Sequence, residues 1–313
     1  MSGRSLAFDI GGSSVKVALV DGGAEPRIAG LPLAPIALQT RDVDELRRVV
    51  PAATTAALER VGAIDRVAIS TTGVVSADGT VIYSGSIAGY AGTRWAELFE
   101  QSFPGRFDAV HVANDGDCAA WAEFVAGRGR STGALAHFVL GTGLGGGAVV
   151  ADALVTDPPG GRGNFGHVAV PAPEPLRCVA CGRTRCAEDF AATRGVVRNA
   201  PCPAQTIREL SACLVRGDRD AAYAFATAGE WLGHAIAAVV HMLRIETVTV
   251  GGGLALAART SGGNVYVDAA RTTARKLTAG PVRVLESRLG NDAGLLGAAA
   301  LAARAVADGR RAA

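Results

Sequence analysis

Runs of apolar residues flank a cluster of glycines in the middle of the chain, and this pattern predicts two strands joined by a tight turn. Residues 138–150 read F-V-L-G-T-G-L-G-G-G-A-V-V, with five glycines within seven residues. The apolar runs have the length and β-rich composition of strands, and the glycines mark the turn. A turn this poor in side chains lets backbone N–H groups approach a phosphate chain closely. A phosphate-binding turn is therefore favoured over a purely structural hairpin.

The same pattern occurs 130 residues earlier, where residues 8–20 read F-D-I-G-G-S-S-V-K-V-A-L-V. At this offset Phe8 aligns with Phe138, and Gly11 aligns with Gly141. Two strand–turn–strand units at one offset suggest a duplicated domain with a phosphate turn in each half. A nucleotide is then expected to lie between the halves.

Hydrophobic periodicity predicts the remaining elements, in which strands alternate with helices. Further strands are predicted at residues 66–70, 81–87, 110–112, 247–250 and 282–285. Helices are predicted at residues 42–60 with an interruption at Pro51, and at residues 116–126, 205–216, 220–243 and 293–305, with a frayed tail beyond about residue 305. Residues 158–167 are predicted to form a loop because they are rich in glycine and proline.

Composition narrows the class of protein. The chain has 313 residues, which suits two domains of ordinary size, and it is 49% hydrophobic and 19% charged. A net charge of +2 without a long basic run does not favour nucleic-acid binding. No apolar stretch reaches membrane-spanning length, and the first strand pattern begins at Leu6, which leaves no room for a signal peptide. A cytoplasmic protein that binds neither nucleic acid nor membrane is expected.

One histidine and three cysteines have the composition of a closed zinc site. His167 ends the predicted loop, and Cys178, Cys181 and Cys186 follow it. One imidazole and three thiolates are enough for tetrahedral zinc. A thioredoxin-like site would need C-x-x-C at the start of a helix after a strand, and a nucleic-acid zinc ribbon would need a basic surface and usually a second cysteine pair. Zinc binding by these four residues is therefore favoured.

Two carboxylates lie where the chemistry of phosphate transfer would need them. Asp9 is at the entrance of the first glycine turn, where it can hold a magnesium ion near phosphates, usually through water; an Asx-turn is the alternative. Asn114 and Asp115 end a predicted strand, and open α/β sheets bind ligands at the carboxyl ends of their strands. A simple helix N-cap is an equally common reason for this pair.

Four motifs, taken together, resemble the ROK family of sugar kinases and related repressors. They are D-I-G-G-S-S-V-K, N-D-G-D-C-A-A-W-A-E, G-T-G-L-G-G-G and the histidine with its cysteine cluster. The resemblance extends from residue 6 to about residue 300. It implies two α/β domains of the ribonuclease-H-like, actin-like ATPase kind with an interdomain cleft. The smaller N-terminal domain would comprise residues 1–115 plus the C-terminal helix 296–313, and the larger domain, with the zinc loop, residues 116–295.

The resemblance implies ATP-dependent phosphorylation of a hexose or an N-acylhexosamine, with Mg²⁺ and a structural Zn²⁺. Asp115 would be the catalytic base, and His167 would be shared between zinc and the sugar. The sugar-binding residues would be Gly73, Ser86, Asn114, Asn164, His167 and Glu188. The residues that bind the nucleotide and its magnesium would be Asp9, Gly11, Gly12, Ser13, Lys16, Gly141, Thr142, Gly143, Gly251, Gly252 and Gly253.

The chain departs from the family pattern on the sugar side. Ser86 stands where the family commonly has Asn, and Asn164 stands where relatives typically have Glu. The cysteine motif has one extra residue between its first two cysteines and has Arg185 in place of a glycine. A sugar-binding sensor without turnover is therefore one alternative, and a polyphosphate-dependent glucokinase is another, although such relatives generally lack the cysteine cluster. Repressor members carry an N-terminal helix-turn-helix, whereas this chain starts at the first predicted strand, and relatives are often homodimers.

Overall fold

The two predicted strand–turn–strand units form at the predicted offset. In the first, β1 (Arg4–Ile10) is followed by β2 (Ser14–Asp21); in the second, β9 (Ala134–Leu140) is followed by β10 (Leu144–Val150). Both strands of the second unit begin 130 residues after their counterparts in the first. The glycine-rich turns thus occupy equivalent places in the two halves of the chain.

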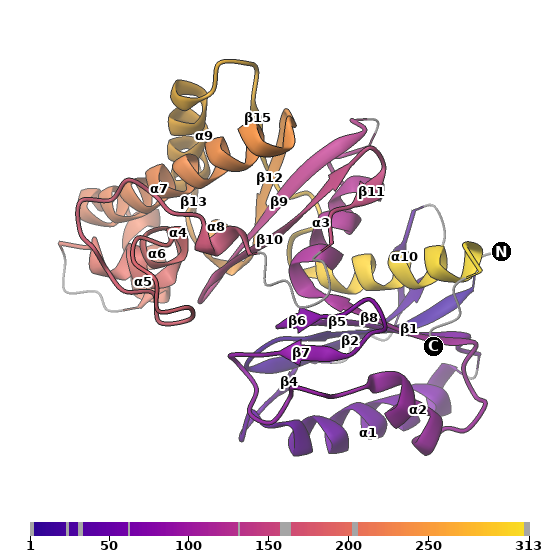
Figure 1. The fold of residues 1–313 in the computed structure, drawn as a ribbon. Coiled ribbons are helices and arrows are strands. Elements are labelled where there is room, and N and C mark those ends of the chain that lie inside the picture. Colours follow the sequence, from indigo (N-terminus) through magenta and orange to yellow (C-terminus); the bar gives the residue numbers. More distant parts are fainter. Residues whose placement is uncertain are drawn as a thin grey trace. The chain divides into compact units, whose positions relative to one another are not determined.

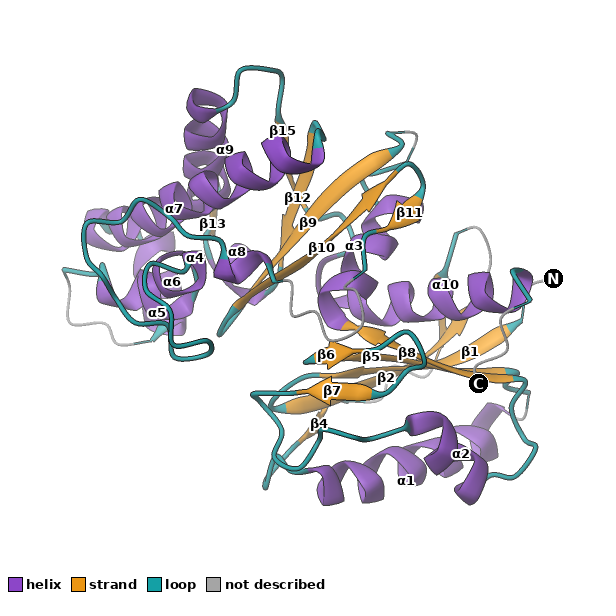
Figure 2. Cartoon of the chain, viewed as in Figure 1, coloured by secondary structure: helices purple, strands orange, loops and turns teal. Residues whose placement is uncertain are grey.

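A computed structural model describes residues 3–22, 25–30, 34–61, 63–130, 132–156, 164–201 and 206–309. The chain divides into two units, whose elements are drawn in Figures 1 and 2. Unit 1 comprises Met1–Ala126, Thr156–Arg162 and Asp292–Ala313, and unit 2 comprises Gly127–Val155 and Gly163–Asn291.

The sheet of unit 1 has the order β3 (Arg27–Gly30), β2, β1, β5 (Arg66–Thr71) and β8 (Ala109–Asn114), and the short β4 (Ile36–Ala37) also pairs with β2. β1 is antiparallel to β2 and parallel to β5, and β5 is parallel to β8. Both β1 and β5 are almost wholly buried, as expected for strands with helices on both faces.

Helices cover both faces of this sheet (Figure 1). α1 (Val43–Val61) and α2 (Trp95–Ser102) lie on one face, and α3 (Asp115–Val125) and α10 (Ala293–Ala307) lie on the other. Leu6, Phe8 and Ile10 belong to the core that includes residues of α1 and α2. Alternate positions of a strand face opposite sides of the sheet, so the small Ala7 faces the alanine-rich α10.

The predicted interruption of the first helix at Pro51 is wrong, because α1 runs without a break from Val43 to Val61. Proline cannot donate to the carbonyl of Arg47, so one helical hydrogen bond is missing. Leu46 and Val50 are nevertheless fully buried in the core with β1 and β5. Burial of this apolar stripe holds the helix together through the proline.

The sheet of unit 2 repeats the arrangement of unit 1. Its order is β11 (Ala153–Leu154), β10, β9, β12 (Thr247–Gly251) and β15 (Arg283–Glu286). β9 is antiparallel to β10 and parallel to β12, and β12 is parallel to β15. The glycine turn of each unit therefore joins the central strand of its sheet to an antiparallel neighbour.

Two long helices pack closely against each other in unit 2. Gly229 of α7 (Arg219–Leu243) has no side chain in the way of α9 (Val265–Leu277), since a Cβ there would lie 2.3 Å from the carbonyl oxygen of Tyr266. Shorter helices complete the unit: α4 (Ala187–Ala191), α5 (Thr193–Arg198), α6 (Ile207–Val215) and α8 (Gly253–Ala257). Two-residue strands and single helical turns occupy the loops: β6 (Val74–Val75), β13 (Arg259–Thr260), β14 (Gly263–Asn264), η1 (Phe165–His167) and η2 (Gly290–Asp292).

Two other element predictions differ from the structure. The strand predicted at residues 81–87 ends early, as β7 (Val81–Tyr83), and a bend follows at residues 85–87. The last helix, predicted to fray after about residue 305, continues to Ala307 as α10. Residues 158–163 of the predicted loop, Gln205 and the final residues 310–313 lie outside the described residues.

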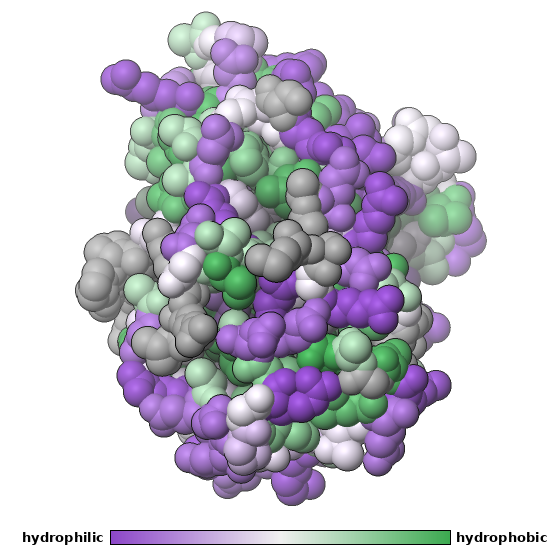
Figure 3. All heavy atoms as spheres, turned by 90° about the vertical axis from the view of Figure 1, so that its right-hand side faces the viewer, coloured by the Kyte–Doolittle hydropathy of each residue, from purple (hydrophilic) through white to green (hydrophobic). Residues whose placement is uncertain are grey.

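Among the residues that the structure describes, no helix has the length and apolar character needed to cross a membrane. On the face drawn in Figure 3, hydrophilic residues are interspersed with hydrophobic ones over the whole visible surface.

Candidate active site

In unit 1, Asp9 is held by side chains from the two strands that flank its own. Its Oδ2 forms an ion pair with Nζ of Lys16 at 3.0 Å, and its Oδ1 accepts a hydrogen bond from Oγ of Ser70 at 2.9 Å. Lys16 of β2 and Ser70 of β5 are the direct cross-strand partners of Asp9. The sheet register therefore fixes a carboxylate, an ammonium and a hydroxyl at the entrance of the first glycine turn.

Space for the Asp9 carboxylate depends on a glycine in α10. A Cβ at Gly294 would lie 2.7 Å from Oδ1 of Asp9 and 3.0 Å from Oγ of Ser70. One helical turn later, a Cβ at Gly297 would lie 1.7 Å from the carbonyl oxygen of Cys118 in α3. These two glycines let α10 pack closely against both the sheet and α3.

The first glycine turn presents backbone groups. The N–H of Gly11 donates to the carbonyl of Ser14 at 2.9 Å, which closes the turn around Gly12 and Ser13. Ser86 lies against this turn, because a Cβ at Gly12 would come within 2.8 Å of the Cβ of Ser86. A residue predicted to face the sugar thus contacts a residue predicted to face the phosphates.

Asn114 and Asp115 divide two tasks between them. Asn114 is the N-cap of α3, and its Oδ1 accepts hydrogen bonds from the N–H groups of Gly116 and Asp117. Its Nδ2 donates to the carbonyl of Gly73 at 2.7 Å. The sequence left open whether this pair is a helix N-cap. In the structure Asn114 is the N-cap, and Asp115 is the first residue of the helix.

The carboxyl group of Asp115 is hard to ionise. Burial, followed by the negative charge of Asp9, raises its pKa to about 7. Hydrogen bonds from the N–H of Gly116 and from Nδ2 of Asn114 act in the opposite direction. A carboxylate with a pKa near neutrality can both accept a proton and release it at physiological pH.

Gly73 has a backbone conformation that requires glycine. Its φ is +101°, and a Cβ there would lie 2.2 Å from the carbonyl oxygen of Tyr83. The hairpin of β6 and β7 starts immediately after Gly73 and leads to Ser86. Gly73 therefore fixes the start of the segment that carries Ser86.

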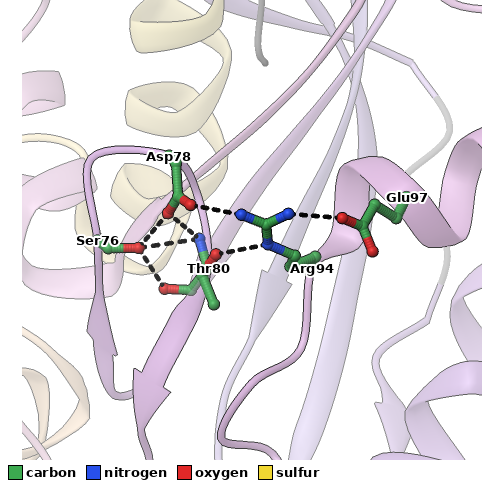
Figure 4. A network of polar contacts seen from close by, with 5 residues as sticks. All are labelled: Ser76, Asp78, Thr80, Arg94 and Glu97. Carbon is green, nitrogen blue, oxygen red and sulfur yellow. Dashed lines mark hydrogen bonds and ion pairs between the residues drawn. The ribbon is translucent and has the colours of Figure 1, made fainter.

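A polar network holds the tip of this hairpin to the start of α2 (Figure 4). Arg94 forms ion pairs with Asp78 at 2.7 Å and with Glu97 at 2.6 Å, and its Nε donates to Oγ1 of Thr80 at 3.1 Å. Hydrogen bonds, the first of them from Ser76, hold the pKa of Asp78 well below its usual range. Exposed ion pairs stabilise little individually, but this set ties Asp78, Thr80 and Glu97 to one guanidinium.

In unit 2, the second glycine turn and the triple glycine lie side by side. The N–H of Gly141 donates to the carbonyl of Gly143 at 3.0 Å, and Thr142 between them is exposed. Gly252 has φ +93°, and a Cβ there would lie 2.2 Å from the carbonyl oxygen of Leu140, the residue before the turn.

The residues around the triple glycine form a shallow pocket. Gly253 starts α8, while Gly251 and Gly252 line the pocket with Ala255, Leu256, Arg259 and Glu286. Nε of Arg259 forms an ion pair with Oε2 of Glu286 at 2.6 Å. Apolar, backbone and charged groups thus line one surface beside the glycine turn.

Glu188 lies on the opposite side of the second turn. Its Oε2 accepts a hydrogen bond from the N–H of Leu144 at 3.0 Å, and a Cβ at Gly143 would lie 2.6 Å from the same oxygen. A residue predicted to bind the sugar is therefore in contact with the turn predicted to bind phosphates.

The four predicted metal ligands lie together in unit 2. The ligand atoms of His167, Cys178, Cys181 and Cys186 are all within 4.8 Å of one another. Sulfur atoms bound to one zinc at about 2.3 Å in a tetrahedron lie nearly 4 Å apart, so the cluster fits zinc. Burial raises the pKa of the thiols of Cys178 and Cys186, so their thiolates need a cation beside them.

The departures within the cysteine motif leave the cluster intact. Arg185 has φ +61°, which lies in the left-handed region that glycine adopts without strain. Its Nε donates to the carbonyl of Ala172 at 2.8 Å, a hydrogen bond that helps to hold the strained residue. The Arg185 position therefore does not prevent the ligands from converging.

His167 and Asn164 come from the same short 3₁₀ turn, η1. Nδ1 of His167 lies 3.9 Å from Sγ of Cys178, so Nδ1 is the ring nitrogen on the metal side. Asn164 is exposed, and its Oδ1 accepts a hydrogen bond from the N–H of Gly166 at 2.7 Å. One lone pair of Oδ1 of Asn164 is thus used within the turn, whereas its Nδ2 offers N–H donors that a carboxylate at this position would lack.

Comparison with known proteins agrees with these motifs. The sequence profile of the ROK family matches residues 5–305. N-acetylmannosamine kinase of Escherichia coli strain K12 is 32% identical over 311 residues, which cover 95% of this chain and 98% of that protein. The chain belongs to the ROK family.

Solved ROK structures share the fold. A ROK family glucokinase from Streptomyces griseus, solved with glucose and AMPPNP, superposes with a TM-score of 0.79 at 28% identity and covers 96% of this chain and 100% of that one. A ROK hexokinase from Thermus thermophilus gives a TM-score of 0.76 at 25% identity, with 97% and 99% covered. The two α/β units therefore have the actin-like ATPase fold of ROK sugar kinases, as the sequence resemblance implied.

Three residues of this ROK site were not predicted as site residues. Ser70 bonds to Asp9, Gly294 leaves space for Asp9, and Thr193 bonds to Gly141. Ser70 begins a run of three hydroxyl residues at the end of a buried strand, which is a weak signal for a site. Gly294 and Thr193 give no local signal, because their partners are distant in the sequence.

Proposed function

We propose that this chain transfers the γ-phosphoryl group of ATP to a hydroxyl of a hexose or an N-acylhexosamine. The observation that carries the proposal is Asp115, a carboxyl with a pKa of about 7 at the end of β8, in a chain that belongs to the ROK family. The related glucokinase was solved with glucose and AMPPNP, and the E. coli relative is an N-acetylmannosamine kinase.

The chemical role of Asp115 follows from the reaction. The transition state of phosphoryl transfer is loose, so catalysis is mostly positioning and charge stabilisation. Asp115 accepts the proton of the sugar hydroxyl as that oxygen attacks phosphorus. Asn114 orients Asp115 through its 3.1 Å hydrogen bond, and also binds the sugar.

The nucleotide side of the site consists mostly of backbone. The proposed phosphate contacts are N–H groups of Gly11, Gly12 and Ser13 in the first turn and of Gly141, Thr142 and Gly143 in the second. Gly251, Gly252 and Gly253 border the adenosine, a role that the pocket beside them supports. Asp9 would hold a Mg²⁺ ion, usually through water, and the ion would supply positive charge against the phosphates. Lys16 adds a positive charge next to Asp9.

The sugar side consists of polar side chains and the metal-supported loop. Gly73, Ser86, Asn114, Asn164, His167 and Glu188 are the proposed contacts. Nε2 of His167 would face the sugar while Nδ1, 3.9 Å from Sγ of Cys178, would be the ligand atom for zinc. Oε2 of Glu188 holds the N–H of Leu144, which leaves Oε1 to accept from a sugar hydroxyl. A zinc ion bound by His167, Cys178, Cys181 and Cys186 would be structural and would fix this loop.

We further propose that an acylated amino sugar is preferred to glucose. Asn164 replaces the glutamate typical of the family; one lone pair of its oxygen is used by the N–H of Gly166, and its Nδ2 offers donors that a carboxylate lacks. An acyl carbonyl is an acceptor that matches these donors.

The chain is also proposed to act as a cytoplasmic homodimer. The need for ATP supports the location, and light scattering of the purified protein tests the dimer.

A panel of sugars tests the proposed function. The purified protein is incubated with hexoses and N-acylhexosamines, with ATP or polyphosphate as donor, and ADP formation and the sugar phosphate are both measured. Turnover with ATP, and best with an N-acylhexosamine, is expected. Sugar binding without turnover would favour a sensor, against which the intact Asp115 argues, and turnover with polyphosphate alone would favour a different donor.

A further inference from the structure

The second glycine turn is held by a residue outside every motif that the sequence singled out. Thr193, the first residue of α5, donates twice to the carbonyl oxygen of Gly141. Its hydroxyl Oγ1 lies 2.7 Å from that oxygen, and its backbone nitrogen lies 3.1 Å from it. Both bonds fix the first peptide of the turn from a helix 52 residues further along the chain.

The far end of the same turn is held by α4, the helix immediately before α5. Oε2 of Glu188 accepts the N–H of Leu144 at 3.0 Å. Only residue 192 separates α4 from α5, and it is fully buried. Glu188 and Thr193 therefore hold the two ends of one turn from a single rigid segment.

A glycine turn needs such support. Glycine has the widest choice of backbone conformations, so a turn of this composition loses much entropy when its N–H groups are fixed around a ligand. The turn has one internal hydrogen bond, from Gly141 to Gly143. Bonds that order it before the ligand arrives reduce the entropy lost on binding.

We infer that Thr193 is a positioning residue that orders the second glycine turn for the nucleotide. The inference rests on the proposed function, in which this turn binds phosphates. Thr193 acts through Gly141 rather than through contact with the nucleotide. The segment that carries Thr193 starts at Cys186, which is the N-cap of α4 and belongs to the metal cluster. Removing the Thr193 hydroxyl should therefore weaken nucleotide binding and leave sugar affinity unchanged.

The test compares Thr193→Val with Thr193→Ser. Valine keeps the shape and the backbone N–H but removes the hydroxyl, whereas serine keeps the hydroxyl. Thr54→Val is the matched control, because Thr54 also donates its hydroxyl to a backbone carbonyl, that of Val50 in α1, at 2.9 Å. Thr193→Val should raise KM and Kd for ATP by about 3- to 10-fold, the equivalent of one hydrogen bond, and Thr193→Ser should restore them.

Hydrogen exchange without ligand separates positioning from direct contact. Amides of residues 141–144 should exchange faster in Thr193→Val than in the wild type, the Ser variant or the Thr54 control. Weaker ATP binding with unchanged exchange would mean that Thr193 touches the nucleotide, and unchanged ATP affinity would mean that it has no such role; either result overturns the inference. A wild type that binds no ATP would remove the proposed function itself, whatever the variants do. If Thr193→Val does not fold, Thr193→Ala is measured in the same way.

Discussion

The two halves of the chain share a topology but equip their glycine turns differently. In unit 1, Asp9 pairs across the sheet with Ser70 of β5. In unit 2, the corresponding cross-strand pair is Val139 and Gly251. The two sheets pair these equivalent backbone positions in the same way. Val139 and Gly251 of unit 2, however, stand where unit 1 has the carboxylate of Asp9 and the hydroxyl of Ser70.

The support of the turns differs in the same way. The first turn is flanked by the Asp9–Lys16 ion pair within its own hairpin. The second has no such pair among the described residues, and it is held from outside by Thr193 and Glu188. The two halves thus share their backbone geometry, while the carboxylates of the proposed chemistry, Asp9 and Asp115, both lie in unit 1. Unit 2 supplies backbone groups, a pocket and the loop that carries the four candidate metal ligands.

The largest expected effect comes from removing the proposed base from unit 1. Asp115→Asn should lower kcat by on the order of 10²–10⁴ because the amide cannot accept the hydroxyl proton as the carboxylate does. Affinities for ATP and sugar, measured by calorimetry, should change little. Asp220→Asn is the matched control, since Asp220 is an exposed acid in the first turn of α7. Near-native kcat in Asp115→Asn would remove Asp115 as the base.

Thermal stability checks that Asp115→Asn remains folded. The pKa of Asp115 is raised from 3.8 to about 7, so the native state binds this proton more tightly than the unfolded chain. The contribution of Asp115 to the free energy of unfolding is thus fully present below about pH 4 and is lost as the pH rises through about 7. Asparagine avoids that loss, so the variant should melt at the same or a higher temperature than the wild type at pH 8. A lower melting temperature would mean that the rate loss has a structural cause.

Removing a metal ligand from unit 2 should affect binding rather than proton transfer. Cys186→Ser should release zinc and weaken sugar binding by about 10- to 100-fold, as loss of support around metal sites commonly does. ATP binding should weaken less. Cys213→Ser, outside the cluster, is the control. Elemental analysis and calorimetry give the readouts, and a wild type without bound metal would contradict the zinc assignment.

The smallest effect is expected from changing sugar preference. Asn164→Glu restores the family's carboxylate, and should improve kcat/KM for glucose relative to N-acetylmannosamine by about 1–2 kcal/mol of transition-state binding. Asn164→Asp tests whether the charge alone is enough with a shorter side chain. The prediction fails if glucose is already the best substrate of the wild type.

Local signals in the sequence predicted most of the fold. Both hairpins form at the predicted offset because the strand pattern and the turn glycines lie within one short window. The metal ligands also converge as predicted, since a cluster of ligand residues within one loop has few ways to be arranged. The predicted break at Pro51 was wrong because burial of α1 outweighed the loss of one hydrogen bond.

The parts of the site that were missed depend on tertiary contacts. Thr193 bonds to a turn 52 residues earlier, and Ser70 bonds to Asp9 across 61 residues. Gly294 is needed only because α10 returns to the first sheet. The sequence did not decide the roles of Asn114 and Asp115, because polar residues just before a helix are typical both of an N-cap and of a catalytic base. The hydrogen bonds of Asn114 assign the cap to it.

The pH dependence of kcat/KM most directly tests the claim that the reactive charge lies in unit 1. The base must be deprotonated, so kcat/KM of the wild type should be level above about pH 7, the pKa of Asp115, and should fall as the pH decreases below it. The fall should approach tenfold per pH unit, and Asp115→Asn should lose it. A wild-type profile that stays flat from pH 5 to pH 8 would contradict the account.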